Sequence, residues 1–330
     1  MTRAIQSYQR LPGYQQGLVL MLVSILFFAS STLVMKAAAV LPGVDGWTAT
    51  AMRGLVGLVI VGVLFWPRRQ FQPAHLLQNP LLILRGVLGA IGTATFYLCM
   101  MELGAGRVTV IGSTYTVFAS LLAVVFLKEK VSLAQLLWMT VALLGLTLVT
   151  GFWEGGGGNP VWDAIAVAGA VVAGGVVVCI RALRHQEHMS TIYSAQCFYG
   201  LLLVTPPVAI DAPAFSLMAV VLMVLASILV AVGQLTMTRA YLDLPVAKGA
   251  SLQLLLPVVT AVGAALFLGE RYSLLDILGT VIILVGCFQM VRIKREPATL
   301  NPAQKLRSET AAPEGSLSLA EQQPSTRVQQ

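Results

Sequence analysis

The sequence predicts an all-α integral membrane protein in which ten transmembrane helices form two inverted five-helix repeats. Hydrophobic residues make up 57% of the 330 residues and charged residues only 11%, with a mean hydropathy of +0.82. A soluble domain carries about a quarter charged residues, so the composition excludes an ordinary cytosolic protein, a disordered chain and a fibrous protein. The apolar residues also fall in blocks of about 20, the helix length that crosses a bilayer. In addition, the second half of the chain repeats a pattern of the first.

Ten apolar blocks are long enough to span a bilayer as helices. They lack the alternation of apolar and polar residues that marks a barrel strand, and transmembrane helices tolerate the glycines that several of them contain. The first block follows Arg3 and Arg10, but its apolar run is too long for a signal peptide, so we expect it to remain attached. The blocks cover residues 17–40, 47–66, 80–102, 105–127, 133–151, 162–182, 190–210, 216–238, 245–268 and 274–292.

Positive charge is distributed unevenly over the connections between the blocks. With the N-terminus in the cytoplasm, only Arg107 and Arg271 fall outside. The cations that fall inside are Arg3, Arg10, Arg68, Arg69, Lys128, Lys130, Arg181, Arg184, Arg239, Lys248, Arg292, Lys294 and Arg295. This bias predicts a multi-pass protein of the inner (cytoplasmic) membrane with both termini cytoplasmic. Residues 1–16 then form a short N-terminal segment, and residues 293–330, rich in Gln, Ser, Glu, Pro and Ala, a disordered tail.

The two halves of the chain align without a gap when the sequence is shifted by 141 residues, so that 97–150 falls on 238–291. In a weaker match, the stretch at 53–57 resembles 196–200. The identical pairs are Leu103 and Leu244, Val117 and Val258, Ala123 and Ala264, Phe126 and Phe267, Leu127 and Leu268, Glu129 and Glu270, Ser132 and Ser273, Leu133 and Leu274, Leu143 and Leu284, and Gly145 and Gly286.

The duplication divides the chain into a first repeat at 17–151 and a second at 162–292, joined by a Gly-rich external linker at 152–161. Each repeat holds five blocks, and an odd number forces the two copies to face opposite ways across the membrane. Inverted repeats are a recurrent architecture of secondary carriers, in which exchange of the conformations of the two halves moves the opening from one side to the other.

These features together resemble the EamA-type branch of the drug/metabolite transporter superfamily, over about residues 17–295. The resemblance rests on the ten-span length, the five-plus-five repeat and the helix-end signatures FLKEK at 126–130 and FLGER at 267–271. Lys36 late in the first block and Arg53 early in the second fit the same pattern. It implies cytoplasmic termini, transport of small metabolites, often export of amino acids, and a central cavity lined by the first, third and fourth spans of each half.

One position departs from the family's pattern, which often has proline in the middle of both the fourth and the ninth spans. Pro257 is present in the ninth, but Thr116 stands at the matching place in the fourth. We therefore expect a kink at Pro257 and no equivalent proline kink in the first half. Pro257 has no N–H, so the carbonyl of Gln253 needs another partner at mid-membrane depth, which is water, a neighbouring helix or a substrate.

Polar side chains at this depth are the candidates for a substrate-binding cavity. Gln253 is the first, and hydroxyl groups on the fourth, third and first blocks are the others, although Ser and Thr also bond the carbonyls of their own helix. The candidates besides Gln253 are Ser113, Tyr115, Thr116, Thr93, Thr95, Tyr97, Ser30 and Ser31.

The first three predicted spans each contain a cation away from their very ends, Lys36, Arg53 and Arg85. Lys36 and Arg53 stand near the same level, one to two turns from the external face, and either form an external vestibule that attracts carboxylates or phosphates, or extend to the headgroups. Arg85 lies close to the cytoplasmic start of its block, and we expect it to extend to the headgroup region.

The repeated glutamates are interpreted as structural turns. Glu129 and Glu270 end a span, and Ser132 and Ser273 follow as helix N-caps, each with a polar residue three positions later that completes a capping box. A role in gating or ion binding is the alternative interpretation.

The sequence shows no pattern for catalysis or for a cofactor. Cys99, Cys179, Cys197 and Cys287 fall in apolar blocks without CxxC spacing, and HxxH at 185–188 has no third ligand nearby, so we expect no metal and no cofactor. HExxH, GxSxG and P-loop motifs are absent from the sequence, so we expect no enzyme. No Asp or Glu lies in the central part of a block, which leaves facilitated diffusion, or coupling through residues nearer the surface.

The predicted function is alternating-access transport of small metabolites, with export of amino acids or related compounds ahead of uptake of a nucleoside-like metabolite. A channel and a membrane-embedded enzyme are the alternatives from other classes. The expected partners are a small-molecule substrate and membrane lipid, not nucleic acid.

Overall fold

The computed structural model describes residues 12–103, 105–149, 159–211, 215–268 and 273–293, which belong to one compact unit. Within these ranges the chain is almost entirely helical and has no strand, which confirms the all-α class. The helices are α2 (Gly13–Ala38), α3 (Gly46–Phe65), α4 (His75–Gln78), α5 (Pro80–Leu103), α6 (Ala105–Ser113), α7 (Tyr115–Leu127), α8 (Leu133–Val149), α9 (Pro160–Leu183), α10 (Met189–Asp211), α11 (Leu217–Ala240), α12 (Val246–Gln253), α13 (Leu255–Leu268) and α14 (Leu274–Arg292).

The predicted apolar blocks coincide with these helices. Seven helical segments of the described residues are long and apolar enough to cross a membrane, and α5 and α8 hold shorter apolar stretches. The fourth and ninth blocks are each divided, because α6 and α7 meet at Thr114 and α12 and α13 meet at Leu254. The predicted tail, most of the linker and Glu270 lie outside the described residues.

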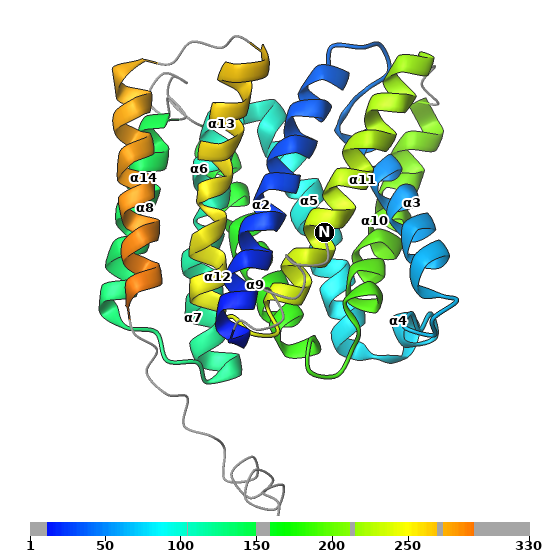
Figure 1. The fold of residues 1–330 in the computed structure, drawn as a ribbon. Helices are drawn as coiled ribbons and strands as arrows, with labels where there is room; N and C mark the ends of the chain where they lie inside the picture. The colour runs from blue at the N-terminus through cyan, green and yellow to red at the C-terminus, as the bar shows by residue number, and fades with distance from the viewer. Residues whose placement is uncertain (1–11, 104, 150–158, 212–214, 269–272, 294–330) are drawn as a thin grey trace, which may run out of the picture. The chain divides into compact units, whose positions relative to one another are not determined.

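The helices run between two ends of the molecule (Figure 1). We call the end at which α2 begins and α9, α11 and α14 end the basic end. There Arg181 near the end of α9 bonds the backbone just after α11, and Lys248 near the start of α12 bonds the carbonyl oxygen of Ile293 after α14. At the opposite end, called the far end, Ala38 at the end of α2 packs against Ala219 near the start of α11.

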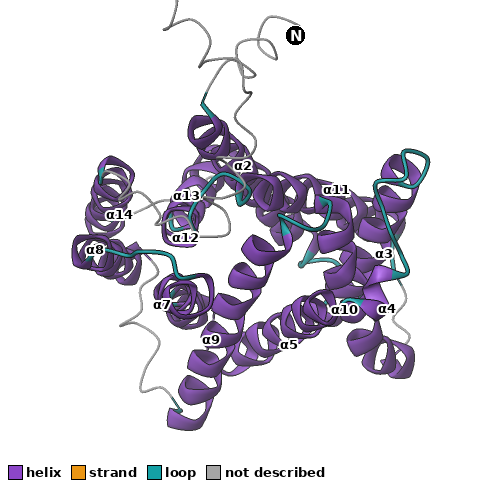
Figure 2. Ribbon diagram, turned by 90° about the horizontal axis from the view of Figure 1, so that it is seen from below, coloured by secondary structure: helices purple, strands orange, loops and turns teal. Residues whose placement is uncertain are grey.

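Helix packing joins each half of the chain to the other. In the first half, α2 packs against α11 and α13; in the second, α9, which the predicted repeat equates with α2, packs against α5 and α7. The pairs α3 with α10, α8 with α14 and α7 with α12 each join one helix from each half. Figure 2 shows the α8 and α14 pair side by side at the edge of the bundle, next to α7 and α12. Exchange of the two halves leaves most of these contacts unchanged, but not that of α7 with α12, because its counterpart, α6 with α13, is not among the main contacts of the described helices.

Glycines bring α8 and α14 into backbone contact. A Cβ atom on Gly145 would lie 2.7 Å from the carbonyl oxygen of Gly279, and one on Gly279 would lie 2.6 Å from that of Gly145. Small residues at such crossings let transmembrane helices approach closely, since van der Waals contact drives their association in lipid. A larger side chain at either position would separate the two helices.

The fourth block is broken although it lacks a proline at its centre, so both halves are interrupted and the break in the first half has another cause than proline. Hydroxyl groups near Thr114 take up carbonyls at the break, with Thr114 Oγ1 donating to Ile111 at 2.5 Å and Thr116 Oγ1 to Ser113 at 3.0 Å. In the second half the break falls at Leu254, so Pro257 lies in the first turn of α13, where its missing N–H leaves no helical hydrogen bond unmade.

Arg85 does not extend to the surface as expected. Its side chain is fully buried, with 0% exposed, and Nη2 donates to Oε1 of Gln196 on α10 at 2.8 Å. The prediction failed because sequence position alone does not show which face of α5 packs against a neighbour, and α5 packs against both α9 and α10.

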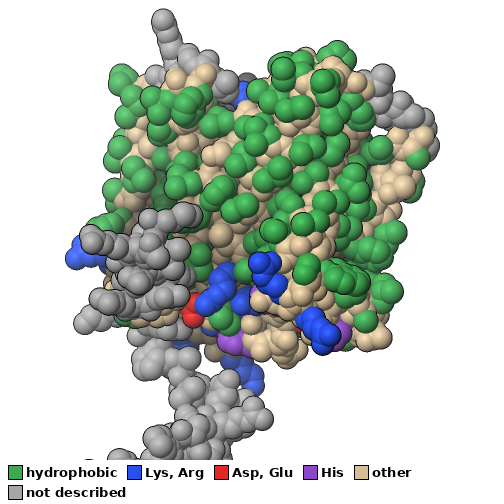
Figure 3. All heavy atoms as spheres, turned by 45° about the vertical axis from the view of Figure 1, so that its right-hand side comes forward, with side chains coloured by type: hydrophobic (Ala, Val, Ile, Leu, Met, Phe, Trp, Pro, Cys, Tyr) green, Lys and Arg blue, Asp and Glu red, His purple; other side chains and the backbone are tan. Residues whose placement is uncertain are grey.

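The outer surface is apolar along most of the length of the helices. Figure 3 shows hydrophobic side chains over the flank of the bundle, while Lys, Arg and His side chains gather at its lower, basic end. The many exposed leucines, valines and phenylalanines would be unfavourable in water. They fit a surface that faces the hydrocarbon of a bilayer.

Candidate functional site

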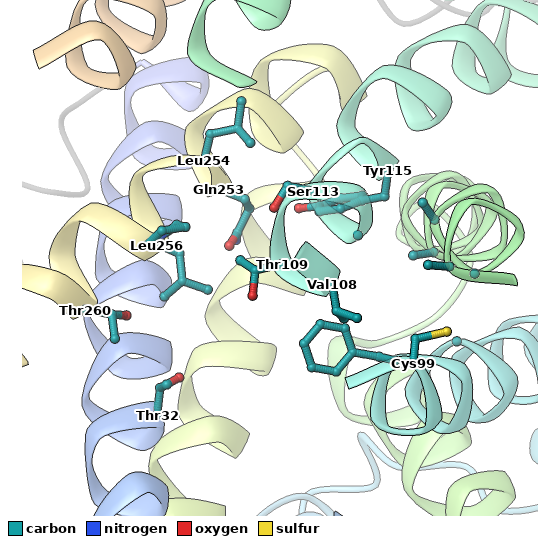
Figure 4. A pocket seen from close by; sticks show the side chains of 18 of the residues that line it. Thr32, Cys99, Val108, Thr109, Ser113, Tyr115, Gln253, Leu254, Leu256 and Thr260 are labelled. Atoms are coloured by element: carbon teal, nitrogen blue, oxygen red, sulfur yellow. The ribbon is translucent and has the colours of Figure 1, made fainter. Parts of the chain in front are cut away.

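A cavity of about 610 Å³ lies in the far-end half of the bundle. It is bordered by α2, α5, α6, α9 and α13, and Figure 4 shows side chains from several of these helices converging on it. Its polar lining residues are Thr32, Lys36, Thr95, Cys99, Thr109, Ser113, Tyr115, Gln253 and Thr260. The volume is in the range of small-molecule sites.

The floor of the cavity lies where the two broken helices meet. Ser113 ends α6 and Tyr115 begins α7, while Gln253 ends α12 just before the break at Leu254. Because a helix end leaves backbone groups without partners within the helix, the two breaks place polar groups at mid-depth beside these side chains. In Figure 4 Gln253, Ser113 and Tyr115 lie near one another at the floor.

Gln253 also links the floor to α2. Its side-chain nitrogen donates to the sulfur of Met21 at 3.1 Å and lies 3.4 Å from the hydroxyl oxygen of Ser24, and its side chain is buried. Ser24 donates in turn to the carbonyl oxygen of Met21 at 2.7 Å. The amide therefore holds α12 against α2 at the point where the cavity ends.

The walls are small and largely apolar. α9 contributes Ala166, Gly169, Ala170 and Ala173, and α5 contributes Gly92 and the ring of Phe96. Among the described residues that line the cavity, Lys36 is the charged one, and none is Asp, Glu or His. Lys36 and Thr32 are exposed and Gln253 is buried, so the cavity narrows from the far end to its floor. Such a lining suits a small molecule with apolar surface and a few hydrogen-bonding groups.

Below the floor, toward the basic end, an apolar cluster fills the centre of the bundle. Met21 and Ile25 of α2 pack with Tyr241, Leu244 and Ala250, all fully buried or nearly so. A Cβ atom on Gly249 would lie 2.4 Å from the ring of Tyr241, so α12 and this ring are in tight contact. None of these five residues lines the cavity, and Tyr115 and Leu256, which do line it, pack against the cluster, so the cluster lies directly between the cavity and the basic end.

A charged network covers the apolar cluster at the basic end. Glu129, just after α7, accepts a hydrogen bond from Nε of Arg181 at 3.2 Å and from the backbone nitrogen of Val246, the first residue of α12, at 2.8 Å. Arg181 donates further to the carbonyl oxygens of Tyr241 and Leu242, both at 2.6 Å. One carboxylate thus ties α7 of the first half to α9 and to the N-terminus of α12, where helix amides favour negative charge.

Lys248 forms a second link at the same end. Its ammonium donates to the carbonyl oxygen of Ile293 at 2.6 Å and to the hydroxyl of Tyr14 at 3.1 Å, so α12, α14 and α2 are joined at one point. Lys248 is almost fully buried, with 3% exposed. At the far end, the ion pair of Arg107 and Asp163, with two contacts of 2.8 Å, joins α6 to α9 beside the cavity.

The loop between α9 and α10 adds positive charge to the basic end. Burial, reinforced by the nearby charge of Arg239, lowers the pKa of Arg184 to about 10. Burial and Arg184 also lower the pKa of His188. Burial also lowers the pKa of His185, and the nearby charges of Arg181 and Arg184 lower it further. The two histidines are therefore uncharged at neutral pH.

The structure brings part of the predicted set together. Gln253, Tyr115, Ser113 and Lys36 all line the cavity, and Thr95 of the third block lies with them. These residues come from five helices, α2, α5, α6, α7 and α12. The helix of Tyr97 is described, but its side chain lies outside the described part of the chain.

Other predicted residues lie elsewhere. Thr116 is fully buried, donates across the break to the carbonyl oxygen of Ser113 at the end of α6, and does not line the cavity. Ser30 points outward and bonds the carbonyl oxygen of Leu26, and Ser31 is buried and bonds that of Ala226 on α11. Thr93 and Arg53 line a different, small pocket, so Arg53 and Lys36 do not share a vestibule.

Three cavity hydroxyls were not predicted, those of Thr32, Thr109 and Thr260. Thr109 precedes Ser113 by four residues and Thr32 precedes Lys36 by four, and residues at this spacing share a helix face. A search one helical turn before each predicted residue would therefore have found Thr109 and Thr32. Thr260 lies three residues after Pro257, which also lines the cavity.

The residues interpreted as structural turns occupy helix ends. Ser132 and Gln135 exchange hydrogen bonds of 3.2 and 2.9 Å, and Ser273 and Asp276 form a capping box at the start of α14. The carboxylate of Glu129, however, reaches across to Arg181 and Val246 and does not close its own turn. Glu270 lies outside the described residues.

Comparison with known proteins places these features in a family context. A family model described as the EamA-like transporter family matches residues 15–151 and again residues 160–292. Two relatives, both named pseudopaline exporter CntI and from the UCBPP-PA14 and PAO1 strains of Pseudomonas aeruginosa, are 25% identical over 281 residues, which are 84% of this chain and 96% of theirs. A crystal structure at 15% identity matches with a TM-score of 0.72 over 83% of this chain and 96% of its own, which supports the fold alone.

Proposed function

The chain belongs to the EamA-like transporter family, and we propose that it exports small metabolites, in particular amino acids or related compounds, by alternating access. Family membership and the exporter relatives make it a multi-pass membrane transporter and not an enzyme. The proposal extends this to a location in the inner membrane, ten transmembrane spans and both termini in the cytoplasm.

One observation carries the proposal: the cavity narrows to a floor at mid-depth, and the same bundle is filled from that floor to the basic end. This is the arrangement of a carrier that opens to one side at a time. The apolar cluster around Met21 and Tyr241 and the network of Glu129 and Arg181 then form the closed side. The basic end faces the cytoplasm by the positive-inside rule, so the described conformation faces outward.

The inverted repeat supplies the means of reversal. Most helix contacts are unchanged when the halves are exchanged, the contact of α7 with α12 excepted, and α2 and α9, which the repeat equates, begin at opposite ends. Exchange of the conformations of the halves 17–151 and 162–292 would move the cavity to the basic end. The matched breaks at Thr114 and Leu254 give both halves a joint at the same depth.

The cavity favours substrates with an anionic or hydrogen-bonding head and a modest apolar part. Lys36 near its far-end opening provides positive charge, Gln253 at its floor provides both a donor and an acceptor, and alanines and glycines of α9 leave space for an apolar side chain. Amino acids and their derivatives have these features. The Pseudomonas relatives are named as exporters of pseudopaline, which is consistent with a metabolite as cargo.

Counterflow in proteoliposomes tests the proposal. Vesicles that contain the purified protein and an excess of an unlabelled amino acid are diluted into trace labelled amino acid, and saturable, transient accumulation is the expected result across a panel of amino acids. Nucleosides form a second panel, and accumulation of these alone would replace the proposed substrate class. Flux that never saturates would indicate a channel, and chemical change of the label an enzyme.

A further inference from the structure

A second, much smaller pocket lies across α5 from the cavity. It is enclosed by α3, α5 and α10, has a volume of about 20 Å³, and is lined by Arg53, Gly89, Gln196 and Cys197 among others. A space of this size holds about one water-sized guest and is far too small for an amino acid. The pocket is therefore separate from the proposed transport site.

The guanidinium of Arg85 borders this pocket. A Cβ atom on Gly89 would lie 2.6 Å from its Nη1, and its Nη2 donates to Oε1 of Gln196 at 2.8 Å, so two lining residues touch it directly. The side chain is fully buried, with 0% exposed. The absence of a side chain at Gly89 is what lets the cation lie against the wall of the pocket.

Hydrogen-bond donors at this place have too few acceptors. Nε and Nη1 of Arg85 have no hydrogen-bond partner among the described residues. The hydroxyl of Tyr193 interacts with Cys197 and Arg53 and supplies no acceptor to Arg85, and a Cβ atom on Gly57 would be 2.6 Å from both Tyr193 Oη and Cys197 Sγ. Buried donors are normally paired, so this excess indicates an acceptor that the chain itself does not supply.

The charge at the pocket is also uncompensated. Arg53 lines it and Arg85 borders it, and in the described part of the chain neither forms an ion pair. A guanidinium remains protonated in proteins, and a buried charge without a counter-ion is strongly unfavourable. The fully buried charge of Arg85, with the half-buried Arg53 beside it, therefore favours a negative partner at the pocket. A water molecule would satisfy a donor but not the charge.

We propose that this pocket binds a small monovalent anion, of the size of chloride, between α3, α5 and α10. The anion accepts hydrogen bonds from Arg85 and compensates the charge of Arg53. It thereby fastens α5 of the first half to α10 of the second, next to the existing bond between Arg85 and Gln196. This site does not depend on which substrate occupies the cavity.

Thermal unfolding of the purified full-length protein in detergent tests the proposal. At fixed pH and ionic strength, replacing gluconate by chloride should raise Tm by about 2–4 °C, in proportion to the logarithm of the chloride concentration once the site begins to fill. Bromide should act like chloride. The Arg85→Gln variant should lose this response, while Arg68→Gln, which removes an exposed cation at the basic end, should keep it.

A second measurement does not depend on a stable variant. Crystals of the wild-type protein soaked in bromide should show an anomalous peak beside Gly89, Arg53 and Gln196. An equal Tm in chloride, bromide and gluconate, together with no bromide peak at this place, would overturn the proposal. A chloride response that persists in Arg85→Gln would also overturn it, because the anion would then act elsewhere. Transport assays are not part of this test, so its outcome is independent of the proposed function.

Discussion

The basic end and the far end are formed by the same helices, yet one is filled and the other is hollow. At the far end α9 presents alanine and glycine to α2 and α13, and about 610 Å³ stays open between them. At the basic end the same helices meet bulky residues such as Met21 and Tyr241, above which Glu129 and Arg181 form their ion pair. The two ends therefore differ in the size of the side chains between the helices and in the ion pair at the basic end. The same helices form both ends.

The largest expected effect comes from breaking the closed side. Glu129→Gln removes the charge that Arg181 and the α12 amide share, a loss of about 2 kcal/mol for charge-assisted bonds that are mostly buried. Because this loss falls on the closed state, the basic end should open about 30-fold more often. Labelling of an Ala250→Cys reporter from the basic side, in a background without other cysteines, measures it.

The matched control for that variant is Asp243→Asn, which breaks the more exposed pair of Arg239 and Asp243 between neighbouring turns at the same end. Such pairs contribute little, so labelling should change less than about threefold. If Glu129→Gln leaves labelling unchanged as well, the network is not what closes the basic end.

The next largest effect is expected at the floor of the cavity. Gln253→Leu removes the floor amide, and with it one hydrogen bond to a substrate, so counterflow efficiency should fall about tenfold while membrane insertion is retained. Gln289→Leu on α14, whose side chain does not line the cavity, is the control and should transport normally. Unchanged kinetics in Gln253→Leu would remove this residue from the site.

A smaller effect is expected at the break without a proline. Thr114→Ala removes the hydroxyl that bonds the carbonyl of Ile111, which should cost about 1 kcal/mol and lower Tm by about 2–4 °C. Thr140→Ala deletes an equivalent bond on an exposed, unbroken helix and should have almost no effect. Equal Tm values for the two variants would show that the hydroxyl at Thr114 does not support the break.

The smallest effect is a pH dependence at the basic end. Burial holds the pKa of His188 below its ordinary value of 6.5, and its Nδ1 accepts from the backbone nitrogen of Ser190. The unfolded chain therefore takes up a proton first as the pH falls below about 6.5, and the folded protein loses stability over that range. Tm measured between pH 7.5 and 5.5 should fall less steeply in His188→Gln, and parallel curves would contradict this origin.

The sequence predicted where the helices lie, because each span needs about 20 apolar residues regardless of its neighbours. It also predicted that Gln253 and Ser113 are functional candidates, since a proline or a run of hydroxyls at mid-depth leaves backbone and side-chain groups without water. It did not predict which face of each helix packs against its neighbours. Thr116 and Arg85 were misplaced for this reason, since a helix in lipid has little polarity contrast around its circumference to mark the packed side.

Long-range pairs were equally hidden from the sequence. Glu129 had a local explanation in the turn after its helix, and nothing in its neighbourhood pointed to Arg181, 52 residues away, or to the amide of Val246. The repeat suggests that Glu129 and its counterpart have similar roles in the two halves, but it does not identify their hydrogen-bond partners. Only the packing of α7 against α9 and α12 brings these groups together.

The amide of Gln253 has only two hydrogens to donate, and in the described conformation it directs them at Met21 and Ser24. If Gln253 binds cargo as proposed, a cargo that accepts one of these hydrogens would draw the amide away from α2. Cargo binding and the contact between α12 and α2 would then compete for the same two hydrogens, so that binding would weaken the packing below the floor of the cavity.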